Sequence, residues 1–459
     1  MSGLVAAAVA AILLMVALAL LMRSRPQVFP MMAIAALPFR VPISADGRTV
    51  NLLIPLYLVV GAGTLAHLLP ALRRSLMRGR EGASPTPAGA AYTGSTSHAP
   101  VLLDWLLLAA VALYAVQASY SSDAVKALEN LAFFYVPFGL LYALLRGVNW
   151  TRELLLTCLG IAVCEAVVFA GIGFVEYGRK ELLLNPKVVA ANDYDNYFRV
   201  NSLFFDPSIY GRFLALVMIA ITTVVLWTRA RRDVLAGGAI LLWLLGGLVT
   251  SFSQSSIAAL LLGLAVLAAW RWDVRATIYV SLAAAAIAAV VALLAPPSLH
   301  IGLRGAGGSA NNATNGRAHL VSGGLSLFAE APLQGHGSGS FEKAYKAHNS
   351  GGASVQNATS ASHTIPITVA AEQGILGLAL YVALLASAFA LLFAGAGRSP
   401  PRIALAACFA ALVLHTWTYA DFLEDPLTWT LLGVGAALAA RGGALPERAP
   451  GAEPVTATA

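Results

Sequence analysis

The residues best suited to chemistry lie between Gly316 and Leu378, where a polar stretch leads back into a long apolar segment. His363 comes directly before Thr364 and Pro366, residue types that are typical of the start of a helix. The positive end of the helix dipole disfavours a second proton on the imidazole. A neutral imidazole could accept a proton from an attacking hydroxyl. The alternative is a histidine that only makes local hydrogen bonds.

Three arginines are candidates for binding a phosphate group. Arg199 lies at the edge of an apolar segment, Arg212 lies inside that segment, and Arg317 lies in the second polar stretch. Guanidinium groups match the oxygens of phosphates, and an arginine inside an apolar helix is costly without an anionic partner. The alternatives are an ion pair between Arg212 and Asp206, and a solvated cation at Arg317.

Glu372 follows His363 on the same predicted helix. At 100° per residue, their separation places Glu372 roughly opposite the start of that helix. We therefore expect Glu372 to contact another loop or helix rather than to orient His363. Gly374 and Gly377 are expected to allow close helix packing.

A glycine-rich run, Gly335-His336-Gly337-Ser338-Gly339-Ser340-Phe341, precedes this helix. It lacks the Lys-Ser/Thr pair of a Walker loop. Its backbone N–H groups could bind an anion, with His336 beside them, or the run could be an ordinary tight turn. The histidines of the polar stretch lack the spacing of zinc ligands, so we predict neither a metal nor another cofactor.

Two further polar turns adjoin apolar segments. The first runs from Ser251 to Ser256 and includes Gln254. The second contains Asp421, Glu424 and Asp425 before the last apolar segment. The three acids could act as an acid/base or cation site, although solvated acids in a short outer turn are the favoured interpretation.

The composition predicts an integral membrane protein. Apolar residues make up 58% of the chain and charged residues 11%, against about 25% charged in soluble domains. The mean hydropathy is +0.75. The net charge of +7 does not indicate nucleic acid, because the basic residues flank apolar segments as membrane topology requires.

The apolar segments predict an all-α polytopic protein with about 12–13 transmembrane helices, each long enough for a hydrocarbon core of about 30 Å. Basic residues gather at one set of segment ends, which is therefore cytoplasmic. The predicted helices are residues 3–22, 27–43, 50–70, 101–119, 127–145, 153–175, 203–228, 234–250, 253–270, 276–295, 364–394, 403–419 and 427–440.

The predicted organisation alternates helical blocks with polar excursions. Two excursions, residues 176–202 and 296–363, face the extracytoplasmic side, and the second holds the chemical residues. The helical blocks are residues 1–70, 101–175, 203–295 and 364–441, with a flexible cytoplasmic linker at 71–100 and a disordered cytoplasmic tail at 442–459.

From Arg199 to the last helix, the chain resembles the O-antigen ligase and O-antigen polymerase superfamily of bacterial membrane glycosyltransferases. The likeness rests on Gly316-Arg317, on the run from Pro332 to Phe341, and on Ser362-His363 followed by Glu372-x-Gly374-Ile375-Leu376-Gly377-Leu378. Where relatives commonly carry Ser-Arg-Gly, this chain has Ser253-Gln254-Ser255.

The resemblance implies a GT-C-like, metal-independent, inverting transferase in the bacterial inner membrane. Its donor would be a polyprenyl-pyrophosphate-linked glycan and its acceptor a glycan or glycolipid. It implies that His363 is the catalytic histidine and that Arg199 and Arg317 lie near the donor phosphates. Arg212 or Arg317 would have to compensate for the neutral Gln254, or the donor differs. Glu372, His336 and Asp425 would support the site. The alternative from another class is a transporter or flippase of lipid-linked glycans.

Overall fold

A computed structural model of the chain describes residues 2–45, 48–73, 101–183, 198–275, 278–279, 317–348 and 364–441. About 80% of the described residues are helical. Eight helices are long and apolar enough to cross a membrane, and three shorter helices are also apolar. These eleven correspond to eleven of the thirteen predicted segments, so the prediction of an all-α polytopic membrane protein is confirmed.

The elements follow one another in a simple order. The first half contains α1 (Ser2–Ser24), α2 (Val28–Ala36), β1 (Val41–Ala45), β2 (Arg48–Leu52), α3 (Ile54–Gly63), η1 (Thr64–Leu68), α5 (Leu102–Ala118), α6 (Ala124–Asn130), η2 (Leu131–Tyr135), α7 (Val136–Arg146) and α8 (Arg152–Arg179). The second half contains α10 (Pro207–Trp227), α11 (Arg231–Thr250), α12 (Gln254–Arg271), α15 (Arg317–Glu330), α16 (Phe341–His348), α17 (Ile365–Phe393), η6 (Ala396–Arg398), α18 (Pro400–Thr418) and α19 (Pro426–Ala439).

The predicted helix over 27–43 is wrong. α2 ends at Ala36, and the chain then forms the antiparallel hairpin of β1 and β2, in which Val41 lies opposite Leu52. Pro38 explains the early end, because it has no N–H to donate to the Ile34 carbonyl, which accepts from the Leu37 N–H at 3.2 Å instead. The nine residues of α2 rise only about 14 Å, too little to cross a bilayer.

Several predictions lie partly or wholly outside the described residues. They are the helix over 276–295, most of the linker over 71–100, the tail over 442–459, and large parts of both polar excursions, including His363.

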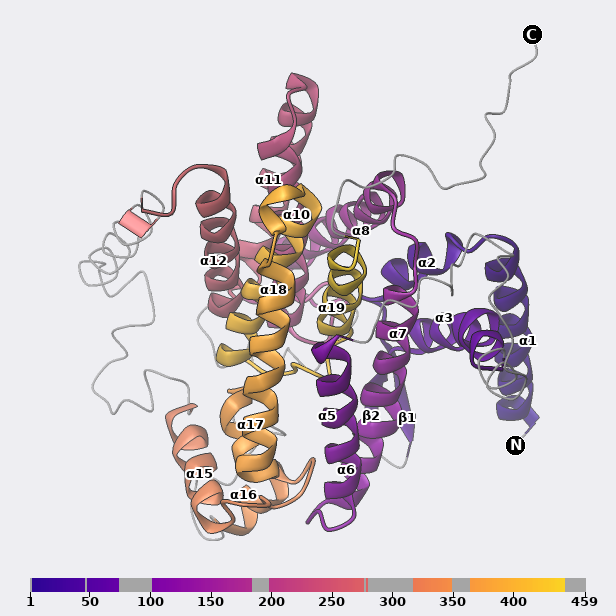
Figure 1. Cartoon of the computed structure of the whole chain (residues 1–459), viewed down its shortest axis with the longest axis vertical. Coiled ribbons are helices and arrows are strands. Elements are labelled where there is room, and N and C mark those ends of the chain that lie inside the picture. Colours follow the sequence, from indigo (N-terminus) through magenta and orange to yellow (C-terminus); the bar gives the residue numbers. More distant parts are fainter. Residues whose placement is uncertain are drawn as a thin grey trace.

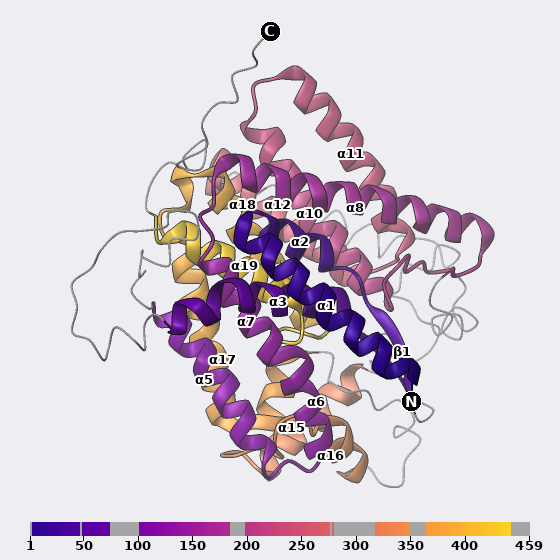
Figure 2. The same ribbon diagram turned by 90° about the vertical axis from the view of Figure 1, so that its right-hand side faces the viewer.

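α10 lies at the centre of the helical bundle. It contacts α11, α12 and α18, while α18 also packs against α17 and α19 (Figure 1). Apart from Arg212 and a few hydroxyl groups, α10 is apolar on all sides, which is typical of a helix with neighbours all around it. Of its most apolar 18 residues, 72% are buried. α1 and α3 pack against each other at the edge of the bundle, beside the hairpin (Figure 2).

One end of the bundle carries the short helices. α15 and α16 lie there together with the turn between α5 and α6, and α17 runs from them into the bundle beside α5 (Figure 1). This arrangement brings the glycine-rich run between α15 and α16 against the first turns of α17 and the end of α5.

Candidate active site

α17 is broken close to its start. Gly374 has φ 64° and ψ −162° inside the helix, a conformation that is essentially restricted to glycine. The Ile375 N–H donates to the Pro332 carbonyl at 2.8 Å, so the loop before α16 replaces the missing helical hydrogen bond. A Cβ at position 374 would overlap the Leu333 carbonyl. We expected close helix packing to be the reason for a glycine at position 374. The main reason is the backbone conformation at this break.

The glycine-rich run is an anion cradle, and the anion is part of the protein. The N–H groups of Gly339 and Phe341 donate to the two carboxylate oxygens of Glu372, at 2.9 and 3.0 Å. The Gly337 N–H donates to the Glu372 carbonyl at 2.8 Å. Gly335, Gly337 and Gly339 all have positive φ, which turns these groups inwards. The expectation that Glu372 binds another loop is therefore confirmed.

The turn between α5 and α6 holds the other side of this loop. The Gln117 amide donates to the Gln373 carbonyl at 3.2 Å, and the Tyr120 hydroxyl donates to the Gln334 carbonyl at 2.8 Å. The Ser121 hydroxyl donates to the Ser338 carbonyl at 2.8 Å. Three distant parts of the chain thus form one rigid junction at this end of the bundle.

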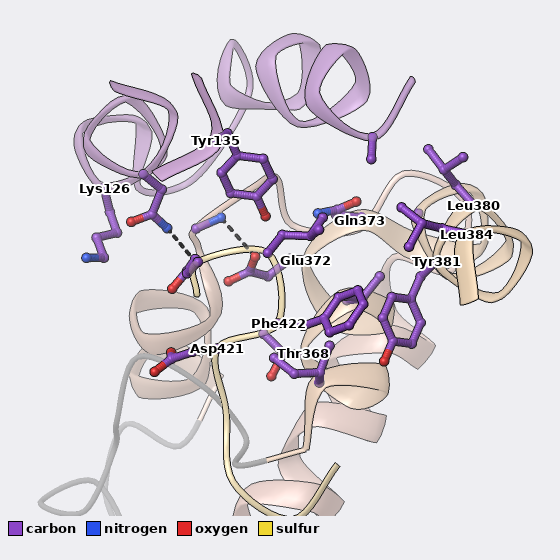
Figure 3. Close-up of a pocket in the computed structure, with 18 residues that line it drawn as sticks. Lys126, Tyr135, Thr368, Glu372, Gln373, Leu380, Tyr381, Leu384, Asp421 and Phe422 are labelled. Carbon is purple, nitrogen blue, oxygen red and sulfur yellow. Dashed lines mark hydrogen bonds between the residues drawn. The ribbon is translucent and has the colours of Figure 1, made fainter. Parts of the chain in front are cut away.

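A cavity of about 100 Å³ opens beside this junction. Ile365 and Thr368, in the first turn of α17, lie on its wall together with Glu372. Figure 3 shows the rings of Tyr381 and Phe422 side by side, with Lys126 and Asp421 on the opposite side. Its complete lining is Ala110, Lys126, Asn130, Tyr135, Gly339, Ile365, Thr368, Val369, Glu372, Gln373, Gly377, Leu380, Tyr381, Leu384, Asp421, Phe422, Leu423 and Glu424.

The acids of the turn before α19 are buried or half-buried. Asp421 and Glu424 line the cavity, and Asp425 is 2% exposed. Burial, together with the neighbouring Asp421, raises the pKa of Glu424 to about 8, while Lys126 opposes the rise. Burial also raises the pKa of Asp421 above its usual range, and Arg212 and Arg40 oppose that rise. The favoured interpretation of solvated acids therefore fails for Asp425, while the half-buried Asp421 and Glu424 face the cavity.

Arg212 pairs with Asp425 and not with Asp206. The Nη2 atom of Arg212 lies 2.6 Å from Oδ2 of Asp425, and both side chains are almost fully buried. Nη1 of Arg212 also donates to the Ala420 carbonyl at 3.3 Å. Asp206 instead caps α10 by accepting from the Ser208 N–H at 2.6 Å. Two helices that are distant in sequence, α10 and α19, are thereby joined by one buried ion pair.

The remaining predicted residues are more dispersed. Nε of Arg199 donates to the Ser251 carbonyl at 3.2 Å, so this arginine lies at the turn that leads to the exposed Gln254. Nε2 of His336 lies 3.0 Å from the Leu327 carbonyl of α15. Arg317 is the first residue of α15. Neither His336 nor Gln254 lines the cavity.

Sequence reasoning missed Lys126, Asn130 and Arg40. The predicted helix began at residue 127, whereas α6 begins at Ala124 behind Asp123, whose carboxylate accepts from the Lys126 N–H at 3.3 Å. The Ser-Ser-Asp sequence at 121–123 was the available signal for this N-cap. An earlier start puts Lys126 and Asn130 one turn apart on the same helix face. Arg40 lies over the Phe205 ring at 4.5 Å.

Within the described part of the chain, no group of three or more His, Cys, Asp and Glu side chains has the arrangement of a metal site. Residues 239–382 match the family model described as O-antigen ligase. Over this segment the chain is similar to the O-antigen ligase family, which supports the resemblance described above. No curated protein matches the chain.

The matched segment runs from α11 into α17. It contains the glycine-rich cradle, Glu372 and the Gly374 break, and it also contains His363. The other wall of the cavity comes from outside it, from α6 and from the turn before α19. The O-antigen ligase segment and two further parts of the chain therefore build the cavity together.

Proposed function

We propose that this protein is a membrane glycosyltransferase of the O-antigen ligase type. It moves a glycan from a polyprenyl-pyrophosphate carrier to an acceptor hydroxyl during assembly of a cell-surface polysaccharide. The observation that carries the proposal is the family match. The matched segment ends within α17, and the first turn of α17 lines a polar cavity. His363 lies two residues before Ile365 of that wall.

In the proposed reaction, His363 accepts the proton of the acceptor hydroxyl as its oxygen attacks the anomeric carbon. The bond between that carbon and the pyrophosphate oxygen breaks, and polyprenyl pyrophosphate leaves with the electron pair. Direct displacement inverts the anomeric centre. Arg199 and Arg317 stabilise the negative charge on the leaving group, which removes the need for a metal ion or a general acid. Arg212 is buried in its ion pair with Asp425 and adds no net charge at the leaving group.

An apolar cavity supports a place for the carrier lipid. It has a volume of about 180 Å³ and lies between α2, α8, α10, α18 and α19. Phe213 and Leu427 line it, and they are close in sequence to Arg212 and Asp425. We propose that the isoprenoid chain of the donor enters here, so that its pyrophosphate reaches the arginines at the extracytoplasmic end.

The direct test uses purified protein in detergent, a polyprenyl-pyrophosphate oligosaccharide and candidate acceptors, with mass spectrometry of the products. We expect transfer of the oligosaccharide and release of polyprenyl pyrophosphate. A transporter would release no such product in detergent, where there are no two sides. Absence of transfer to every glycan and glycolipid acceptor would contradict the proposed function.

The His363→Ala variant tests the base. We expect its transfer rate to fall at least about 100-fold, the usual contribution of a general base, while its thermal unfolding stays that of the wild type. The matched control is His319→Ala, which alters an exposed histidine of α15 and should keep full activity. Wild-type turnover by His363→Ala would remove His363 from the mechanism.

A further inference from the structure

One wall of the polar cavity carries hydrogen-bonding groups that the proposed mechanism does not use. Asn130 is 3% exposed and lines the cavity. Its Nδ2 group donates to Oε1 of Glu424 at 3.0 Å and to the Tyr114 hydroxyl at 2.9 Å. Its Oδ1 atom is buried and has no hydrogen-bond partner among the described residues. A buried acceptor without a donor is costly, so a ligand that donates a hydrogen bond would be favoured here.

The charges on the lining argue against a phosphate in this cavity. Its ionisable groups are one lysine, Lys126, and the three carboxyl groups of Glu372, Asp421 and Glu424, apart from the tyrosine hydroxyls. Glu372 already binds the backbone of the glycine-rich run. Burial favours the protonated forms of Asp421 and Glu424, so the lining offers one cation, Lys126, beside the Glu372 carboxylate. A pyrophosphate would therefore meet no excess of positive charge, which disfavours binding. An uncharged ligand that is rich in hydroxyl groups meets no such penalty.

The remaining wall is aromatic. The rings of Tyr381 and Phe422 lie 5.5 Å apart between centroids and at 89° to each other (Figure 3). The Trp417 N–H donates to the Tyr381 hydroxyl at 2.9 Å, which fixes the orientation of this ring. A pyranose has a polar edge of hydroxyl groups and an apolar face of C–H groups, so it matches a cavity with one polar and one aromatic wall.

We infer that this cavity binds an uncharged sugar ring of the acceptor glycan, whose hydroxyl groups donate to Oδ1 of Asn130 and to Glu424 and accept from Lys126. That the ring belongs to the acceptor rests on the proposed function, in which His363 is the base. Ile365, two residues after His363 in the sequence, lies on the cavity wall. The pyrophosphate of the donor would then lie outside this acidic cavity, on the side of the arginines.

A binding experiment tests the subsite without catalysis. Saturation-transfer NMR is recorded with methyl glucoside, mannoside, galactoside and N-acetylglucosaminide on protein in lipid nanodiscs, because maltoside detergents would compete. We expect at least one glycoside to bind, and Glu424→Gln and Asn130→Ala each to weaken its binding about tenfold, the loss of one or two hydrogen bonds. The matched control, Glu342→Gln, alters an exposed carboxylate of α16 and should leave binding unchanged.

Two results would overturn the inference. The first is that no glycoside binds the wild type. The second is that a glycoside binds the folded variants as tightly as it binds the wild type. If Asn130→Ala or Glu424→Gln fails to fold, Lys126→Gln replaces it, since Lys126 is half-buried and should also weaken binding. Inorganic pyrophosphate is the comparison ligand. If pyrophosphate binds in place of the glycosides and the same variants weaken its binding, the inference is also rejected.

A kinetic experiment separates this inference from the proposed function. In the transfer assay, Glu424→Gln should raise KM for the acceptor about tenfold and leave KM for the donor unchanged. If the wild type transfers glycan and the variant keeps its acceptor KM, the subsite is wrong and the function stands. If the glycosides bind but the wild type transfers nothing, the function is wrong and the sugar site stands.

Discussion

The Glu372 carboxylate joins two segments that are distant in the chain. It lies in α17 and is 7% exposed, and both oxygens accept backbone N–H groups from the loop before α16. Hydrogen bonds to a charged acceptor are stronger than neutral ones and shorter. One side chain therefore fixes the loop against the helix that begins beside His363.

The Glu372→Gln variant should be destabilised. A glutamine keeps one acceptor oxygen but turns an N–H₂ group towards the other backbone donor, which loses a buried partner. We expect a loss of about 2 kcal/mol in the free energy of unfolding, measured by denaturant or thermal unfolding in detergent. Glu342→Gln, in an exposed ion pair with Lys346, should change it by less than about 0.5 kcal/mol. Equal stability of the two variants would mean that the carboxylate does not hold the loop.

Glu424 should make stability depend on pH. Its pKa of about 8 in the folded protein lies above its ordinary value of 4.5, so the folded protein keeps a proton that the unfolded chain releases. The free energy of unfolding then falls as pH rises from about 4.5 to about 8. Glu424→Gln removes this dependence, so its thermal midpoint should rise relative to the wild type between about pH 5 and about pH 8. Parallel midpoint curves for both proteins over this range would contradict the assignment.

At the scale of the element, α17 is two helical pieces that meet at Gly374. The first piece carries Thr368 and Glu372 to the cavity, and the second crosses the bundle beside α5 and α18. The carbonyls of residues 371–373, freed by the break, accept hydrogen bonds from His336, Gly337 and Gln117. The break therefore supplies the attachment points for the loop, and non-helical backbone near a membrane is tolerated because protein groups satisfy it.

Gly374→Ala should disrupt this attachment. Alanine disfavours φ 64° with ψ −162°, and its Cβ would overlap the Leu333 carbonyl. We expect a loss of about 2 kcal/mol or more in stability, with a fall in transfer activity. Gly160→Ala in α8 is the matched control, because its Cβ would meet no atom within 4 Å. It should be neutral or stabilising by up to about 1 kcal/mol. A Gly374→Ala protein as stable as this control would show that the break is not required.

At the scale of the whole molecule, the ion pair between Arg212 and Asp425 joins the central helix to the last one. α10 and α19 belong to different apolar clusters of the bundle, and the pair lies where they meet the turn that carries Asp421 and Glu424. Its position thus connects the cavity wall to the core. A buried charge that loses its partner is strongly destabilising.

Asp425→Asn should therefore cost about 3–5 kcal/mol in stability. The double variant Arg212→Met, Asp425→Leu should regain most of this loss, because it removes both charges and fills similar volume. A double-mutant cycle on unfolding free energies measures the coupling. The exposed pair of Lys346 and Glu342 provides a reference that should couple by less than about 1 kcal/mol. Additive effects of the single variants would show that the buried pair does not join the two helices energetically.

The sequence by itself determined the class of the molecule. Apolar segments of sufficient length predict membrane helices because lipid leaves a chain few other ways to satisfy its backbone. Among the described residues, eight helices are long and apolar enough to span, and three shorter helices are also apolar. The order of short motifs indicated the O-antigen ligase family, which the match over residues 239–382 supports. The start of α6 behind Asp123 was also readable, as an N-cap signal.

Only the tertiary structure decided which groups meet. Arg212 could have paired with Asp206 or bound an anion, and the glycine-rich run could have held a phosphate. The first pairs with Asp425 and the second binds Glu372. Both partners lie on other elements, and the choice depends on how the helices pack. A residue's local sequence fixes its place on a helix, but the partner that offsets the cost of burying its charge comes from whichever element packs against it.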